Sequence, residues 1–212
     1  MVRNKKELEI ILEKTPKFKS PSKKLEQYIC DSSIASELLW NAYIYGDIKD
    51  RIIADFGCGT GILSYGALIL GAKEVLCIDI DYNALSIAKK FLGNIPINFP
   101  IHYICCDIRK ISLRSIDTVI MNPPFGVYIR GIDMKFLEQA FEMSPLSVYS
   151  IHKYNPKSHK LITKLANKKG YATQIIAIKN MAIHATYKNH IKNVHRFKIS
   201  IYRFVSEGLN NG

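Results

Sequence analysis

The chain has 212 residues, of which 48% are hydrophobic and 23% are charged. This composition excludes a largely disordered protein, and the length suits one α/β domain or one domain with a small extension. No run approaches the roughly 18 apolar residues of a membrane-spanning helix, and the N-terminal region lacks the apolar stretch of a secretory signal. Five cysteines without a C-x-x-C pair favour reduced thiols, so we expect a cytoplasmic protein that makes no contact with a membrane.

The net charge of +12 is concentrated in the last third of the chain. Residues 1–28, 29–149 and 150–212 carry net charges of +4, −3 and +11. Such a basic segment indicates either a polyanionic partner or a solvated lysine surface, and the charge alone does not separate the two.

Hydrophobic periodicity predicts two N-terminal helices and then an alternation of strands and helices. Helices are expected at 5–14 and 32–45, with Ser32 and Ser33 as caps of the second, and a basic irregular segment at 15–24 joins them. Strands are expected at 51–56, 74–80, 101–106, 116–121, 146–151, 174–178 and 198–204, and the remaining helices at 61–70, 82–92, 133–143 and 158–168.

This alternation predicts an α/β fold with a mostly parallel, doubly wound sheet of seven strands and helices on both faces. No helical pattern separates the last two strands, which favours an antiparallel closing hairpin. We divide the chain into an N-terminal helical flap or extension (1–45), a main domain (46–205) and a short flexible tail (206–212).

A glycine-rich loop, Asp55-Phe56-Gly57-Cys58-Gly59-Thr60-Gly61, directly follows the first expected strand. Glycines let the backbone approach a ligand, and the following helix points its first amides into the same crevice. A nicotinamide or flavin nucleotide also suits such a loop, but Asp55 would repel a pyrophosphate. S-adenosylmethionine has no phosphate and carries a cationic amino group, so the acid favours this ligand over a nucleotide. A tight turn without a ligand is the alternative.

Acidic residues also follow the second and third strands. Asp79 can accept hydrogen bonds from both ribose hydroxyls of an adenosine. Asp107 can meet the adenine amino group of the same cofactor, although an aspartate after a strand is often only a turn residue. We expect the neighbouring Ile80 and Ile108 to contact the cofactor as well.

The most specific motif is Asn122-Pro123-Pro124-Phe125, at the end of the fourth strand. The Asn122 side-chain oxygen and the Pro123 carbonyl can together accept both hydrogens of a planar amino group. Phe125 offers a flat face on which an aromatic base can stack. These four residues predict methyl transfer to an exocyclic amine that is activated by positioning rather than by a strong base.

In this order the motifs resemble those of class I S-adenosylmethionine-dependent methyltransferases, which implies a Rossmann-like fold with this cofactor. Further segments are similar to the small methyltransferase-like enzymes that form N6-methyladenosine in small-subunit ribosomal RNA. These segments are Leu25-Glu26-Gln27-Tyr28, 119–126, Gly131, 133–134, 136–137, 148–153 and 185–188, and the resemblance as a whole runs from about residue 25 to residue 204.

The resemblance implies cofactor contacts, which we expect at Gln27, Cys30, Asp55, Gly57, Cys58, Gly59, Thr60, Asp79, Ile80, Asp107, Ile108 and Asn122. Two departures from the family pattern are visible. The family often has proline and then a cofactor-contacting threonine after Gln-Tyr, where this chain has Ile29 and Cys30. The glycine loop contains Phe56 and Thr60 in place of the leucine and cysteine of eukaryotic members.

We therefore expect transfer of a methyl group to the N6 amine of an adenosine in RNA, most specifically small-subunit ribosomal RNA. RNA contacts are expected at His152, Lys153, Lys160, Lys164, Lys168, Tyr187 and Lys188, and no metal site is expected. A surface role without RNA is equally compatible with His152 and Lys153. The resemblance also implies a small zinc-binding activator subunit, added to the sheet edge near residues 101–104.

Two other functions compete with this interpretation. A protein-glutamine N5 methyltransferase also presents Asn-Pro-Pro to a planar amide, but usually with tyrosine after the prolines and with a separate helical domain. A non-catalytic RNA-binding protein could retain the fold with a degenerate site, whereas here the loop, Asp79 and the Asn-Pro-Pro-Phe motif are intact.

Overall fold

A computed structural model describes residues 2–28, 30–96, 100–183 and 195–209. The strands are β1 (Ile52–Phe56), β2 (Glu74–Asp79), β3 (Ile101–Cys105), β4 (Thr118–Met121), β5 (Ser147–Lys153), β6 (Tyr171–Ile183) and β7 (His195–Ser206). The helices are α1 (Lys5–Leu12), α2 (Ser32–Ile44), α3 (Ile62–Ile69), α4 (Tyr82–Leu92), α5 (Ile132–Glu142) and α6 (Pro156–Lys168), with the 3-10 turns η1 (Ile108–Lys110) and η2 (Glu207–Leu209).

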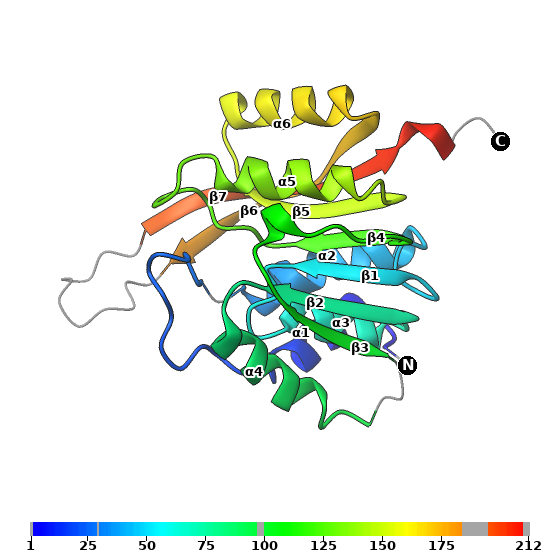
Figure 1. Cartoon of the computed structure of the whole chain (residues 1–212), viewed down its shortest axis with the longest axis vertical. Coiled ribbons are helices and arrows are strands. Elements are labelled where there is room, and N and C mark those ends of the chain that lie inside the picture. The colour runs from blue at the N-terminus through cyan, green and yellow to red at the C-terminus, as the bar shows by residue number, and fades with distance from the viewer. Residues whose placement is uncertain (1, 29, 97–99, 184–194, 210–212) are drawn as a thin grey trace.

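The strands form one sheet in the order β3-β2-β1-β4-β5-β7-β6 (Figure 1). Strands β1 to β5 pair in parallel, and β7 lies antiparallel between β5 and β6. The predicted parallel sheet with an antiparallel closing hairpin is therefore confirmed. The chain leaves β1 toward β2 on one side and returns as β4 on the other, and at such a switch point the carboxyl ends of the strands leave a crevice.

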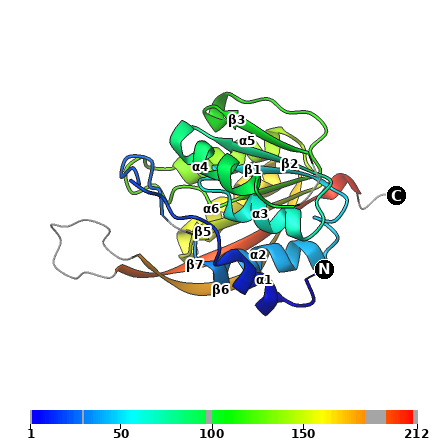
Figure 2. The same ribbon diagram turned by 90° about the horizontal axis from the view of Figure 1, so that it is seen from below.

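Helices cover both faces of the sheet, as predicted (Figures 1 and 2). The first four helices bury side chains such as Leu8, Leu38 and Leu85 against one face. Helices α5 and α6 bury Leu137 and Ile162 against the other. The sheet is buried between these two layers along β1 and β4, so the strand ends that form the crevice are held rigidly.

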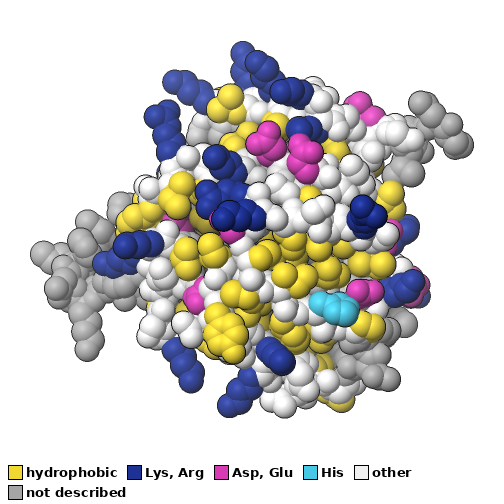
Figure 3. Space-filling model, in the orientation of Figure 1, with side chains coloured by type: hydrophobic (Ala, Val, Ile, Leu, Met, Phe, Trp, Pro, Cys, Tyr) yellow, Lys and Arg dark blue, Asp and Glu magenta, His cyan; other side chains and the backbone are white. Residues whose placement is uncertain are grey.

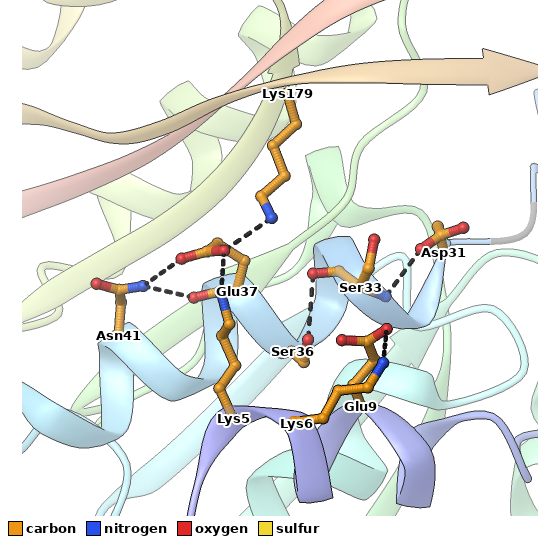
Figure 4. A network of polar contacts seen from close by, with 9 residues as sticks. All are labelled: Lys5, Lys6, Glu9, Asp31, Ser33, Ser36, Glu37, Asn41 and Lys179. Carbon is orange, nitrogen blue, oxygen red and sulfur yellow. Dashed lines mark hydrogen bonds and ion pairs between the residues drawn. The ribbon is translucent and has the colours of Figure 1, made fainter.

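The N-terminal helices are a layer of the domain rather than a separate core. Glu37 on α2 accepts hydrogen bonds from Lys5 on α1 (2.6 Å), and its carboxylate pairs with Lys179 on β6 (2.8 Å) (Figure 4). Burial opposes ionisation of Glu37, but the two lysines outweigh it and lower its pKa. The cap of α2 is Asp31, whose carboxylate accepts the Ser33 N–H at 2.8 Å, so the serine caps predicted from sequence are wrong.

The last two strands are much longer than the sequence pattern predicts. Polar residues such as Lys179, Asn180 and Lys198 interrupt the apolar alternation, yet backbone pairing between β6 and β7 continues through them. A bulge between Ile175 and Ala177 also shifts the alternation between faces. Part of the predicted tail is ordered, because η2 occupies residues 207–209, while residues 210–212 lie outside the described part of the chain.

Candidate functional site

A cavity of about 450 Å³ opens at the carboxyl ends of β1, β2 and β4. A segment that we call the strap, residues 13–28, crosses these strand ends and closes one side of the cavity, at the left of Figure 1. The structure brings all the predicted cofactor and catalytic residues to its lining: Gln27, Cys30, Asp55, Gly57, Cys58, Gly59, Thr60, Asp79, Ile80, Asp107, Ile108, Asn122, Pro123, Pro124 and Phe125. Their contacts with a ligand remain predictions.

The glycine loop is pulled tightly onto β2. The backbone N–H groups of Gly57 and Cys58 donate to the Ile78 carbonyl at 2.8 and 3.0 Å. Gly59 has a φ of +55°, and a Cβ atom there would lie 2.9 Å from the ring of Phe18 in the strap. Only glycine combines this backbone conformation with such a close approach, so the loop and strap form one wall of the cavity.

Asp55 is a buried carboxylate with one oxygen engaged. Its Oδ2 atom accepts hydrogen bonds from the backbone N–H (3.0 Å) and the hydroxyl (2.6 Å) of Ser64. Its Oδ1 atom is buried and has no hydrogen-bond partner among the described residues. Burial raises the pKa of Asp55 to about 7, against the hydrogen bonds from Ser64. A cationic group in the cavity would satisfy this oxygen and stabilise the ionised form.

Asp79 is held by the backbone on both sides. Its Oδ2 accepts the Gly59 N–H and its Oδ1 accepts the Asp81 N–H, each at 2.8 Å. Burial raises its pKa, opposed by these hydrogen bonds. The adjacent Asp81 caps α4 and accepts a hydrogen bond from Nε2 of Gln27 at 2.6 Å, so the strap is tied to the end of β2.

Asp107 has a partner that the sequence did not reveal. Nε of Arg109 donates to its two carboxylate oxygens at 2.9 and 3.1 Å, and Nη2 donates a further hydrogen bond. The hydrogen bonds from Arg109 lower the pKa of Asp107. Arg109 itself lines the cavity. If Asp107 contacts an adenine amino group as predicted, its carboxylate must accept hydrogen bonds from both that group and the Arg109 guanidinium.

The Asn-Pro-Pro-Phe motif supplies an acceptor and an aromatic wall. The Oδ1 atom of Asn122 is buried and makes no hydrogen bond within the described part of the protein. The ring of Phe125 lies 6.4 Å from that of Tyr28, at an interplanar angle of 20°, and 5.4 Å from Phe197 on β7. An unsatisfied buried acceptor beside stacked rings suits a planar group that donates N–H.

Sequence reasoning missed the contribution of the strap to the cavity lining. Phe18 and Lys17 lie in a segment without periodicity, and no motif marks them. Glu26 and Tyr28 were visible only as parts of a family-like segment. Glu26 is 5% exposed, and its Oε1 accepts the Tyr128 N–H at 2.8 Å across 102 residues of sequence.

The predicted RNA contacts lie outside the cavity lining. His152 is fully buried, its ring hydrogen-bonded to Ser150 (2.8 Å) and to Asp133 (3.3 Å), so the prediction that its side chain contacts RNA is wrong. The position of His152 near the end of a strand suggested exposure, but α5 and β7 cover β5 as far as this residue. Lys153 is exposed and places its ammonium 5.3 Å from the centre of the Phe197 ring.

The other basic residues are exposed on α6, which begins after β5 and runs back away from the cavity (Figure 1). Lys160 and Lys168 are separated by about 12 Å along the helix axis. Tyr187 and Lys188 lie outside the described residues. Within the described residues no helix is long and apolar enough to cross a membrane, and no cluster of three His, Cys, Asp or Glu side chains is suited to a metal ion.

Comparisons with known proteins identify the family of the chain. Residues 32–145 match the family described as methyltransferase small domain. The rRNA N(6)-adenosine-methyltransferase METTL5 of Danio rerio is 38% identical over 206 residues, which cover 94% of this chain and 97% of the relative. The rRNA N(6)-adenosine-methyltransferase Mettl5 of Drosophila melanogaster is 31% identical, with coverage of 94% and 95%.

A solved structure is similar along the whole chain. The Pyrococcus horikoshii protein PH1948 is 40% identical and superimposes with a TM-score of 0.86, covering 97% of this chain and 99% of its own. The predicted Rossmann-like methyltransferase fold is thus confirmed by topology and by likeness. Together these matches show that the chain belongs to the methyltransferase small domain family, among the relatives of the rRNA N(6)-adenosine-methyltransferases.

Proposed function

We propose that this protein transfers a methyl group from S-adenosylmethionine to the N6 amine of an adenosine in RNA, with small-subunit ribosomal RNA as the substrate. The observation that carries the proposal is the buried Oδ1 of Asn122, which has no hydrogen-bond partner in the described part of the chain and shares one cavity with Phe125, Asp55 and Asp79. The names of the Danio rerio and Drosophila melanogaster relatives support ribosomal RNA as the substrate.

The residues of the cavity fit the cofactor. Asp79 would accept the ribose hydroxyls, and Oδ1 of Asp55, a buried oxygen that has no hydrogen-bond partner among the residues the structure describes, suits the cationic amino group. Gln27 closes the cavity from the strap through its hydrogen bond to Asp81. When bound, S-adenosylmethionine supplies an electrophilic methyl group on a sulfonium.

The protein contributes position and electrostatics. Asn122 and the Pro123 carbonyl would accept the two N–H groups of the target amine and draw its lone pair out of conjugation with the ring. The nitrogen becomes positive during transfer, so acceptors placed beforehand stabilise that charge without reorganising. Phe125 would hold the base by stacking. No side chain has to remove a proton from the target amine before the methyl group is transferred.

Three observations favour this activity over the alternatives. The Danio rerio and Drosophila melanogaster relatives, which cover nearly the whole chain, are named as adenosine methyltransferases, and this chain has Phe125 where glutamine methyltransferases usually have tyrosine. An inert RNA-binding protein would have no reason to maintain an Asn122 oxygen without a partner among the described residues beside buried Asp55 and Asp79, because unpaired buried polar atoms destabilise the fold.

The test is methylation of small-subunit ribosomal RNA by the purified chain, followed by digestion to nucleosides and mass spectrometry. We expect N6-methyladenosine at a single adenosine, and none with Asn122→Ala. A release-factor peptide containing glutamine serves as the competing substrate. Methylglutamine without N6-methyladenosine would establish the alternative, and cofactor binding with neither product would indicate a non-catalytic protein.

We also propose that a small zinc-binding activator subunit adds to the edge of the sheet. Strand β3 is one of the two edge strands of the sheet, and partly exposed apolar residues such as Leu76 and Ile104 continue across the adjoining face, where hydrophobic side chains gather in Figure 3. Co-purification tests the idea, with Ile104→Lys expected to abolish it and the exposed Ile10→Lys on α1 as control. Full activity of the isolated, monomeric chain would contradict it.

A further inference from the structure

The strap places a second aromatic ring opposite the catalytic motif. The rings of Tyr28 and Phe125 are nearly parallel, with an interplanar angle of 20° and a centroid separation of 6.4 Å. Stacked bases in a duplex are about 3.4 Å apart, so a base between two rings needs about 6.8 Å. The centroid separation, which sets an upper limit on the gap between the ring planes, is close to that value, and both residues line the cavity that contains Oδ1 of Asn122.

The Phe125 wall is supported from the sheet. Phe197 on β7 contacts Phe125 edge to face, with ring centroids 5.4 Å apart. Lys153 lies over the Phe197 ring in turn, with its ammonium 5.3 Å from the ring centre. Because these residues come from the paired strands β5 and β7, this side of the slot is held by the core of the domain.

The Tyr28 wall is held by hydrogen bonds at two points. On one side, the buried carboxylate of Glu26 accepts the Tyr128 N–H at 2.8 Å, which joins the strap to the loop that follows Phe125. On the other side, Gln27 donates to Asp81 at 2.6 Å, next to the end of β2. Both hydrogen bonds come from the two residues that directly precede Tyr28, so they fix the end of the strap from which the Tyr28 ring extends toward the loop.

Glu26 has an unfavourable backbone conformation that the surrounding contacts must stabilise. Its φ is +50°, in the left-handed region that non-glycine residues rarely occupy, and its side chain is 5% exposed. The Glu26 N–H donates to the Lys23 carbonyl, and the Tyr28 N–H donates to the Glu26 carbonyl at 2.9 Å. The turn thus directs the Glu26 carboxylate inward and Tyr28 toward Phe125.

We propose that Tyr28 and Phe125 form the two walls of a slot for the target adenine, and that Glu26 is a positioning residue that sets the width of this slot. The inference rests on the proposed function and adds the second wall of the substrate site. Stacking between two rings accepts any base, so selection of adenine falls to the acceptors at Asn122 and Pro123. A slot of this kind admits only an unpaired base, which predicts a single-stranded or everted target.

The test separates contact with the base from contact with the rest of the RNA. The probes are a single-stranded RNA nonamer with one central adenine and the same nonamer with an abasic site at that position. Stacking of one base changes affinity by about 5- to 150-fold, so the wild type should prefer the adenine nonamer by a factor in this range. Tyr28→Leu should reduce that ratio at least several-fold, while Tyr28→Phe keeps the ring and the ratio.

Cofactor affinity and catalysis complete the readout. Calorimetry with S-adenosylmethionine should give the same affinity for Tyr28→Leu as for the wild type, while kcat/KM for small-subunit ribosomal RNA falls. The inference is overturned if Tyr28→Leu weakens both nonamers equally, or if it weakens the cofactor and leaves the adenine-to-abasic ratio intact. Tyr28 would then support the fold or the cofactor.

Glu26 is tested by its coupling to Tyr28. Glu26→Gln retains an acceptor for the Tyr128 N–H and should behave as the wild type, whereas Glu26→Ala should lower the adenine-to-abasic ratio. The double variant Glu26→Ala/Tyr28→Leu should be no worse than Tyr28→Leu alone, because both act on one wall. Additive losses would refute the positioning role. Failure of the proposed function itself would show separately, as absence of N6-methyladenosine from ribosomal RNA treated with the wild type.

Discussion

The carboxylate of Asp79 accepts a hydrogen bond from the backbone N–H of Gly59 at 2.8 Å. This contact joins the end of β2 to the glycine loop after β1, and it leaves the Asp79 side chain on the lining of the cavity. The residue expected to recognise the ribose therefore also stabilises the loop beside it.

We predict that Asp79→Ala weakens binding of S-adenosylmethionine about 10- to 150-fold, because hydrogen bonds to a charged acceptor contribute roughly 1.5–3 kcal/mol. Isothermal titration measures the change. Asp79→Asn retains an acceptor for the Gly59 N–H and separates loop stability from ribose recognition, so its loss should be smaller. Unchanged affinity in Asp79→Ala would place the cofactor elsewhere.

We predict that affinity for S-adenosylmethionine rises with pH up to about 7. Burial raises the pKa of Asp55 to about 7, and the ionised form is the one that suits a cationic amino group. Below that pH, affinity should fall by about tenfold per unit, because the ionised fraction of Asp55 falls about tenfold with each unit below its pKa. Titrations from acidic to mildly alkaline pH should show this slope in the wild type and a weak, flatter profile in Asp55→Asn.

The stability of the ligand-free protein should depend on pH in the opposite direction to the cofactor affinity. The folded pKa of Asp55 lies above the unfolded value near 3.9, so the native state binds the proton more tightly. This contribution is fully present below about pH 4 and is lost as pH rises through about 7. Urea unfolding of Asp55→Asn should therefore lose less stability across this window than the wild type. Parallel profiles of the two proteins would contradict the assignment.

We predict that Asn122→Ala lowers kcat on ribosomal RNA by about 10²–10³, since removal of one aligned group from a preorganised site has this magnitude. The affinity for S-adenosylmethionine should stay nearly constant, because Oδ1 of Asn122 is assigned to the target amine. Asn122→Asp keeps an acceptor at the same place and should retain more activity. Near-normal methylation by Asn122→Ala would remove the proposed role.

We predict that the exposed lysines of α6 contribute to RNA binding through phosphates. Replacement of Lys160, Lys164 and Lys168 by glutamine should reduce the slope of log affinity against log salt by about 2, at about 0.7 per contact on single strands. Cofactor affinity should not change. The same replacement at three other exposed lysines removes equal charge and serves as the control; these are Lys73, in the turn before β2, and Lys89 and Lys90, on α4.

A triple variant with the wild-type slope and affinity would show that RNA takes another path. The geometry supplies the next candidates, because Lys17 and Lys24 of the strap line the cavity, whereas α6 runs away from it. Glutamine at these two positions would then reduce the slope instead.

The sequence by itself determined the parts of the site whose chemistry is local. The glycine loop, Asp79 and Asn122 each stand directly after a strand, and parallel strands bring their carboxyl ends to one edge. Any chain with this order of strands must place these residues around a common crevice. For the same reason the sheet with its closing hairpin could be predicted from periodicity.

Some segments that lie far apart in the sequence come into contact although the order of the strands does not imply it. Only the tertiary structure decided these contacts. The strap has no periodicity, and Glu26 meets Tyr128 across 102 residues because the chain folds back over the strand ends. His152 resembled a surface residue in the sequence and is fully buried, because α5 and β7 cover the end of β5. The burial of His152 and the contact between Glu26 and Tyr128 both result from packing between segments that are distant in the sequence. A local residue pattern does not indicate which distant surface will cover it.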